Sequence, residues 1–292
     1  MTGERRLSET LHGAPPEALF AVGAVSQYAG AAIAVALFDH IAAAGVAWLR
    51  VLGADAILVA WRRPWRHRFA RVELAWIVAF GSALAIMNLA FYLAIDELPL
   101  GNAVAIEFLG PIAVAAFGSR SRRAAFTLAL AVGGVLLIAE VQPEGSARGV
   151  AFALLAGTAW AGYILLGHRV ARFHAQQEAL AVGMVAGAAV IAVFGVPELG
   201  PALDQPTLLL LALATGLFSN VLPYGIDQVV MRKIDRYRFA VLQAMLPATA
   251  VLVGVVALGQ VPSWAELLGV AAVATALALS DRRTPIPEVV TG

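Results

Sequence analysis

The chain has 292 residues, of which 61% are hydrophobic and 13% charged, whereas about half of a soluble domain is apolar and about a quarter is charged. Its formal net charge of +1 argues against a nucleic-acid partner, and the absence of cysteine excludes a disulfide framework, thiol catalysis and thiolate metal sites. The composition therefore predicts a protein solvated by lipid.

Apolar runs long enough to cross a bilayer follow one another along the whole chain. A spanning helix needs about 20 mainly apolar residues, and the first run is too long for the core of a signal peptide, so we interpret it as a retained span. Stretches such as 151–166 are apolar on every face, which favours helices over barrel strands. In chain order the predicted spans are 17–38, 44–61, 72–94, 100–118, 124–140, 149–170, 176–196, 207–228, 238–258 and 264–281.

The basic residues predict the orientation of these spans. Positive charges gather in the cytoplasmic loops of membrane proteins. Eighteen of the 20 Arg and Lys residues lie at the termini and in the even-numbered loops, and only Arg50 and Arg148 lie elsewhere. The sequence thus predicts a multi-pass protein of the inner (cytoplasmic) membrane, with both termini in the cytoplasm.

Two nine-residue stretches indicate an internal repeat. The stretch from Ala103 to Pro111 resembles the stretch from Phe239 to Pro247, at an offset of 136 residues. The same offset places the acidic loop 96–99 opposite the basic loop 232–235, so matching loops carry opposite charge. We therefore predict an all-α membrane protein with ten transmembrane helices in two inverted five-helix repeats, residues 17–140 and 149–281, as in many secondary transporters.

Short motifs in both halves resemble a known family. They are Met87-Asn-Leu-Ala-Phe-Tyr-Leu-Ala94, Leu98-Pro-Leu-Gly101, Ala105-Ile-Glu-Phe-Leu-Gly-Pro111, Ala159-Trp-Ala-Gly-Tyr-Ile-Leu-Leu-Gly-His-Arg169 and Leu222-Pro-Tyr224. Through them the chain is similar, over about residues 17–281, to the drug/metabolite transporter superfamily of EamA type. Within it the chain resembles amino-acid exporters of the threonine/homoserine type and the related aromatic amino-acid exporters. The resemblance implies two inverted EamA repeats around a central cavity, and export of amino acids or similar metabolites.

Polar side chains inside the spans are candidates for lining a solute path, because such residues are costly in lipid. Asn88 and Tyr92 are spaced i, i+4 and share a helix face, and Asn220 and Tyr224 repeat the spacing. Such a face offers hydrogen bonds to the ammonium and carboxylate groups of an amino acid. The alternative is hydrogen bonding between helices.

Aromatic and acidic residues extend the set of substrate-binding candidates. Trp160 and Tyr163 would line a cavity for apolar or aromatic side chains, and Gln27 is a weaker candidate on the first span. Glu107, apart from Asp55, is the only carboxylate that we expect deep in a span. It is either a proton carrier, which would make transport proton-coupled, or a neutral residue hydrogen-bonded to a neighbouring helix.

Prolines mark three candidate hinges. Pro111 and Pro247 each remove one helix hydrogen bond, which frees the carbonyls of Glu107 and Gln243 four residues earlier. Each repeat then presents a polar side chain and a free carbonyl at one level, so Gln243 is also a substrate-binding candidate. Pro223 acts in the same way in the eighth span. A kink used only for packing is the alternative.

Two charged residues share the second span without facing each other. Arg50 and Asp55 are five positions apart, which places them about 140° apart around a helix, so each is expected to pair across helices or to reach an interface. The sequence has no motif for enzyme chemistry: neither a phosphate-binding loop nor a nucleophile elbow occurs. The five histidines lie at or beyond span ends without metal-ligand spacing, so we predict no enzyme activity, no cofactor and no metal.

Three functions remain open at this point. The leading hypothesis is a secondary exporter of amino acids that works by alternating access. A facilitator or exporter of drugs, nucleotide sugars or other metabolites has the same fold, but a sugar nucleotide would need a basic cavity and only Arg50 lies inside a span. The third is an intramembrane lipid-modifying enzyme whose loop from Arg62 to Arg71 binds headgroups.

Overall fold

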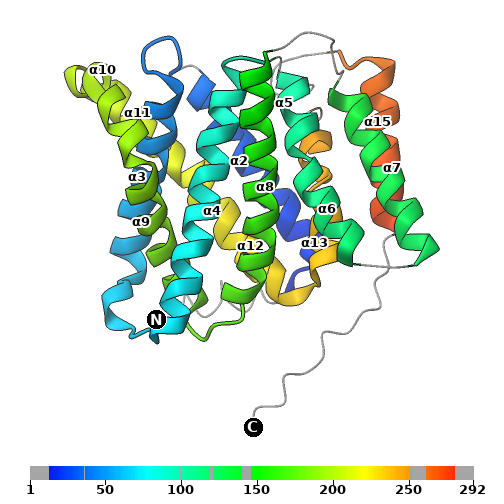
Figure 1. Ribbon diagram of the computed structural model, residues 1–292, viewed down its shortest axis with the longest axis horizontal. Helices are drawn as coiled ribbons and strands as arrows, with labels where there is room; N and C mark the ends of the chain where they lie inside the picture. The colour runs from blue at the N-terminus through cyan, green and yellow to red at the C-terminus, as the bar shows by residue number, and fades with distance from the viewer. Residues whose placement is uncertain are drawn as a thin grey trace.

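The structure is a computed structural model that describes residues 13–35, 37–98, 100–118, 121–139, 146–249, 251 and 261–279. Every regular element within these ranges is helical, and the long helices run between the two ends of one bundle (Figure 1). The second half of the predicted ninth span lies largely outside the described residues.

The first half of the chain follows the predicted spans closely. A short 3-10 turn, Pro64–Arg66, joins the second and third helices. The helices are α2 (Pro16–Val35), α3 (Ala43–Arg62), α4 (Arg71–Ile95), α5 (Leu100–Glu107), α6 (Leu109–Gly118) and α7 (Arg122–Ala139).

The second half is also helical, with more irregular turns. A 3-10 turn, Val196–Leu199, extends the seventh span into a short helix, and a π-helical turn, Leu217–Val221, interrupts the eighth. The helices are α8 (Ala147–Val170), α9 (Gln176–Gly195), α10 (Gly200–Asp204), α11 (Pro206–Gly216), α12 (Leu222–Lys233), α13 (Arg236–Leu242) and α15 (Trp264–Leu279).

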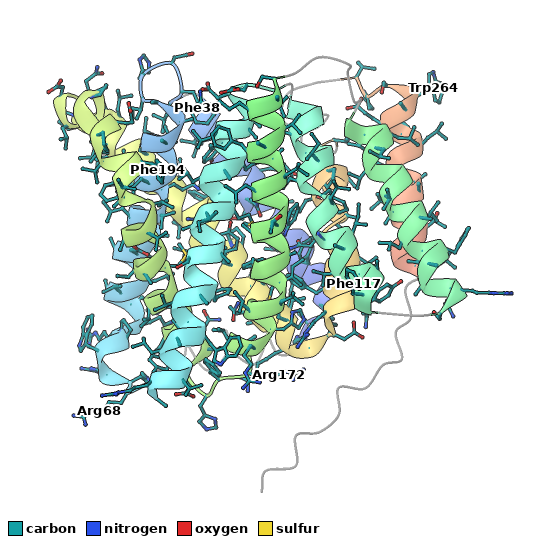
Figure 2. All side chains as sticks on the ribbon, viewed as in Figure 1. Phe38, Arg68, Phe117, Arg172, Phe194 and Trp264 are labelled. Carbon is teal, nitrogen blue, oxygen red and sulfur yellow. The ribbon has the colours of Figure 1, made fainter. Side chains whose placement is uncertain are left out.

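The outer surface of the bundle is apolar. Five helical stretches are long and apolar enough to cross a membrane, namely Ala43–Arg62, Arg71–Ile95, Ala147–Val170, Gln176–Asp204 and Pro206–Lys233. Large side chains such as Phe117, Phe194 and Trp264 point outward, with 90%, 56% and 82% of their surface exposed (Figure 2). Exposing so much apolar surface to water would cost free energy, whereas lipid solvates it. The chain is therefore a multi-pass membrane protein.

Basic loops share one end of the bundle. Arg68, in the turn between α3 and α4, and Arg172, after α8, lie at the same end in Figure 2. Phe38 and Trp264 lie at the opposite end. The bundle therefore has one end with basic loops, as the charge pattern of the sequence requires.

Both nine-residue motifs are interrupted just before their proline. The helix breaks at Phe108, between α5 and α6, and again at residues 243–244, after α13. Proline has no N–H to continue the hydrogen-bond ladder, which explains both breaks. The prediction of a free Gln243 carbonyl is wrong, because the N–H of Leu246 donates to it at 3.0 Å. The chain tightens there into an i to i+3 turn.

The eighth span is longer than predicted and contains the π-helical turn. The N–H of Leu222 donates to the carbonyl of Leu217, five residues earlier. Pro223 follows directly and cannot donate to Ser219, so the ladder widens before the proline. The helix then continues to Lys233 rather than ending at residue 228. Asp227, one residue before the predicted end of this span, therefore lies inside the helix.

Glycines let the helices of the bundle approach closely. A Cβ atom on Gly81 of α4 would lie 1.7 Å from the carbonyl oxygen of Gly183 in α9. A Cβ on Gly216 of α11 would lie 2.4 Å from the carbonyl oxygen of Arg50 in α3. Contacts between small residues are the usual way in which helices pack in lipid. These contacts join α4 to α9 and α11 to α3.

The glycine contact between α4 and α9 is directly testable. We expect Gly81→Ala to destabilise the detergent-solubilised protein by about 1–3 kcal/mol or more, because the added methyl forces two backbones apart. Thermal unfolding measures the effect. Gly133→Ala is the matched control, since a Cβ there meets nothing within 4 Å. Equal unfolding midpoints for the two variants would contradict the close contact.

Candidate functional site

A buried arginine lies in the middle of α3. Arg50 is only 6% exposed. Its Nη1 donates to the hydroxyl oxygen of Tyr92 at 2.7 Å, and its Nη2 donates to Oδ1 of Asn88. The guanidinium carbon also lies 5.0 Å from the centre of the Tyr92 ring. The cation is thus held by neutral groups of α4, with an added cation–π contact.

Asn88 connects this arginine to α12. Its Nδ2 donates to the hydroxyl oxygen of Tyr224 at 3.0 Å and to the carbonyl of Leu84 at 2.8 Å. The hydrogen bonds from Arg50 to Asn88 and from Asn88 to Tyr224 therefore run through three helices, α3, α4 and α12. The predicted shared face of Asn88 and Tyr92 is confirmed, because both residues bind the same guanidinium.

An aromatic contact carries the cluster onward to α8. The ring centres of Tyr163 and Tyr224 are 5.6 Å apart, and Tyr163 stacks on Phe80 at the same separation. The Tyr163 hydroxyl donates to Oδ2 of Asp227 at 2.6 Å. We call the whole set the central polar cluster; it consists of Arg50, Asn88, Tyr92, Tyr163, Tyr224 and Asp227. Its helices α4, α8 and α12 lie near the middle of the bundle in Figure 1.

Two members of the cluster were missed as substrate-binding candidates. Arg50 was considered only for pairing across helices or for reaching an interface, although an arginine inside an apolar span is itself a functional signal. Asp227 is a third buried carboxylate beside Glu107 and Asp55, so the expectation of only two is wrong. The helix continues past the predicted end of the eighth span, which is why this residue was overlooked.

Three predicted residues, Trp160, Glu107 and Gln243, lie outside the central polar cluster. Trp160 is 7% exposed and packs edge-to-face on Phe108, with ring centres 5.6 Å apart. Glu107 and Gln243 are buried at the two helix breaks. The Glu107 carboxyl lies within electrostatic reach of the Tyr28 phenol on α2. These residues do not share the hydrogen bonds of the central polar cluster.

Asn220 and Gln27 also lie outside the cluster. Asn220 is 1% exposed, and both polar atoms of its side-chain amide lack a hydrogen-bond partner among the described residues. Gln27 is half-buried on α2, and its backbone carbonyl accepts a hydrogen bond from Oγ of Ser219 at 3.5 Å. Of the predicted pair on the eighth span, the structure brings only Tyr224 into the cluster.

The three candidate hinge prolines share two features. Pro111, Pro223 and Pro247 are all buried, and each lies at or just after an irregular turn of its helix. Next to the first of them, the carbonyl of Glu107 approaches Gly157 of α8 so closely that a Cβ there would lie 2.7 Å away. The backbone at this break is therefore packed against protein, which is where irregular backbone is tolerated in a membrane.

A surface hollow of about 490 Å³ lies apart from the cluster. It is lined by the end of α3 and the basic turn that follows, namely by Ala60, Trp61, Arg62, Arg63, Arg66 and His67. Arg63 and Arg66 are exposed there.

A multi-pass bundle that buries charged residues on several helices is typical of membrane proteins that move polar solutes or protons. The model of the EamA-like transporter family matches residues 147–280. The threonine/homoserine exporter RhtA of Salmonella typhimurium strain SL1344 is 36% identical over 262 residues, which are 88% of each chain. The protein of the same name from Escherichia coli K12 is 35% identical over 264 residues, 89% of each chain.

This chain belongs to the EamA-like transporter family. A solved crystal structure of another protein matches its fold with a TM-score of 0.69, covering 90% of this chain and 96% of that one at 20% identity. The family resemblance predicted from the motifs is confirmed. The chain is a transporter, so the intramembrane-enzyme alternative is set aside.

Asn88 offers a test of the hydrogen bonds that join the helices. We expect Asn88→Ala to destabilise the protein by about 1–3 kcal/mol, because it leaves the buried guanidinium and the Tyr224 hydroxyl short of a partner. Thermal unfolding in detergent measures the loss. Thr158→Ala is the control, since this exposed hydroxyl bonds, among the described residues, to the carbonyl of Leu154 in its own helix. An Asn88→Ala variant as stable as the parent would show that these bonds do not hold the helices.

Proposed function

We propose that this chain is a secondary transporter that exports amino acids, threonine and homoserine among them, across the cytoplasmic membrane by alternating access. The observation that carries the proposal is the identity of about 35% to threonine/homoserine exporters over nearly nine-tenths of each chain. The buried cluster supports it independently, since it holds one cationic and one anionic side chain among hydroxyl and amide groups. These are the groups that recognise a small zwitterion.

We further propose that the chain forms ten spans in two inverted repeats, residues 17–140 and 149–281. One support is the hydrogen bond between Asn88 and Tyr224, which are 136 residues apart. Glu107 and Gln243, at the two helix breaks, have the same offset. In halves related by a two-fold axis, only residues near the axis meet their own counterparts. The central polar cluster would then lie on that axis.

Contacts at the two ends of the bundle support the same symmetry. Glu97, after α4, pairs with Nε of Arg148 at 3.2 Å and accepts a hydrogen bond from Ser146, at the start of α8. Lys233, at the end of α12, donates to the carbonyl of Ala14 at 2.7 Å, just before α2. Glu97 and Lys233 are again 136 residues apart. Each loop thus contacts the first span of the opposite repeat.

The helix breaks supply the moving parts of the proposal. Pro111 and Pro247 follow the breaks in the fourth and ninth spans, and Pro223 follows the π-helical turn in the eighth. Bending at these hinges would let the two halves rock around the central cluster, with Gln27, Trp160, Asn220 and Gln243 lining the path. We also propose proton coupling through Glu107, a titratable group buried at one of the hinges.

Transport is tested with purified protein in liposomes. We expect the protein to exchange labelled threonine, with competition by other amino acids and none by a bulky organic cation. Tyr224→Ala should slow the exchange up to about tenfold, because a lost hydrogen bond is worth roughly 0.5–1.5 kcal/mol. Phe126→Ala, which removes an aromatic ring that is 60% exposed, is the matched control. Inhibition by the cation but not by amino acids would contradict the expected competition and identify a drug exporter instead.

Proton coupling is tested with an imposed pH gradient. The gradient should drive threonine flux in the parent protein but not in Glu107→Gln. A parent protein that ignores the gradient would remove the proton from the mechanism.

The orientation is testable because the chain contains no cysteine. Single-cysteine variants Arg68→Cys and Arg172→Cys should react with a membrane-impermeant maleimide in inside-out vesicles but not in intact cells. Trp264→Cys, at the opposite end of the bundle, should show the reverse pattern. Labelling of the first two positions from opposite sides would overturn the proposed topology.

A further inference from the structure

We infer that Arg50 and Asp227 are the two charged poles of one binding site, in which Arg50 takes the α-carboxylate and Asp227 the α-ammonium of a zwitterionic amino acid. This inference rests on the proposed amino-acid transport and adds the residues that recognise the substrate. Neither residue was among the candidates from the sequence, and both belong to the central polar cluster.

Arg50 has capacity to bind an anion that the protein does not use. Its partners among the described residues are the neutral oxygens of Tyr92 and Asn88, and it forms no ion pair there. Its Nε is buried and lacks a hydrogen-bond partner. Arginine has five N–H donors in a planar fork that matches both oxygens of a carboxylate. A buried cation normally has an anion beside it, and a substrate carboxylate would fill this role.

Asp227 is the complementary pole. It is 8% exposed, and its described partner is the neutral Tyr163 hydroxyl, which donates to Oδ2. A carboxylate accepts more than one hydrogen bond, so it retains capacity for an ammonium group. Tyr163 orients the carboxylate through this bond, while its own ring is held by stacking on Phe80. The pole is therefore positioned by packed aromatic residues.

Tyr224 connects the two poles. Its hydroxyl is hydrogen-bonded to Asn88, which also binds Arg50, and its phenol interacts electrostatically with both Arg50 and Asp227. Asp227 lies three residues after Tyr224 on α12, so the two share a helix face. The two opposite charges are thus both within electrostatic reach of one phenol, and neutral groups separate them. A zwitterion would neutralise both poles at once.

This arrangement also explains selectivity. A ligand with only a positive or only a negative charge would leave one buried pole without a partner, which is costly in a low-dielectric interior. Both an organic cation and a simple carboxylate should therefore bind poorly. The competing interpretation is that Arg50 and Asp227 only tie helices together, in which case their loss would weaken binding of every ligand alike.

The test compares three compounds as competitors of labelled threonine exchange in liposomes. They are threonine, threonine methyl ester, which lacks the carboxylate, and 3-hydroxybutyrate, which lacks the ammonium. In Arg50→Gln we expect the preference for threonine over the ester to fall about ten- to hundredfold, the usual value of hydrogen bonds to a charged group. The preference for threonine over 3-hydroxybutyrate should persist. Asp227→Asn should show the opposite pattern.

Two control variants and a second readout complete the experiment. Arg68→Gln and Asp204→Asn change the same residue types at exposed positions and should leave both preferences intact. Where a variant has too little flux, the thermal stabilisation of purified protein by each compound gives the same two ratios. An equal loss for all three compounds, or unchanged preferences in both variants, would overturn the inference.

The same data separate this inference from the proposed function. A parent protein that neither carries nor binds threonine would contradict the proposed function itself. A parent protein that carries threonine, while Arg50→Gln and Asp227→Asn keep its preferences, would contradict only the two-pole site.

Discussion

A guanidinium group placed inside an apolar helix bundle must find hydrogen-bond acceptors within the protein, because lipid offers none. Arg50 finds them on Tyr92 and Asn88, and Asn88 in turn holds Tyr224. Three helices that are distant in the sequence are thereby tied to one point. The hydrogen bonds that join these helices therefore follow from the need of the guanidinium for acceptors.

Close helix packing makes the arrangement of this interior possible. Gly216 lets α11 approach the backbone of Arg50 itself, and Gly53 of α3 meets the carbonyl of Leu213 in the same interface. Larger residues would push α11 away and, with it, the π-helical turn and α12 that follow. The small residues therefore support the site indirectly, since they set the distance between the helix that carries the cation and the helix that carries Asp227.

The proposed mechanism uses the contrast between a held centre and interrupted spans. Side chains from four helices meet in the central polar cluster, whereas the fourth, eighth and ninth spans each contain a turn that is not α-helical. The breaks in the fourth and ninth spans lie at matching positions of the proposed repeat, whereas α4, the counterpart of the eighth span, is an unbroken helix. Contacts of Glu97 at one end and Lys233 at the other would then have to open in turn, with the cluster accessible from one side at a time.

The sequence by itself determined the class of protein, the position of most of its helices and its family. These depend on hydropathy along the chain, on charges in loops and on short motifs, all of which are local properties that lipid acts on directly. It also indicated Asn88 and Tyr92 as one face, because helix periodicity alone decides that. It placed the breaks near Pro111 and Pro247 for the same kind of reason.

Only the tertiary structure decided which polar residues meet. Arg50 bonds to Tyr92 and Asn88 because α3 packs beside α4, and no spacing within one span can reveal that neighbour. Asp227 entered the site because α12 continues past the expected end of its span. The carbonyl of Gln243 found a donor through a local tightening of the chain. Side-chain partners across helices depend on the rotation and separation of whole helices, and packing sets those only once the bundle is assembled.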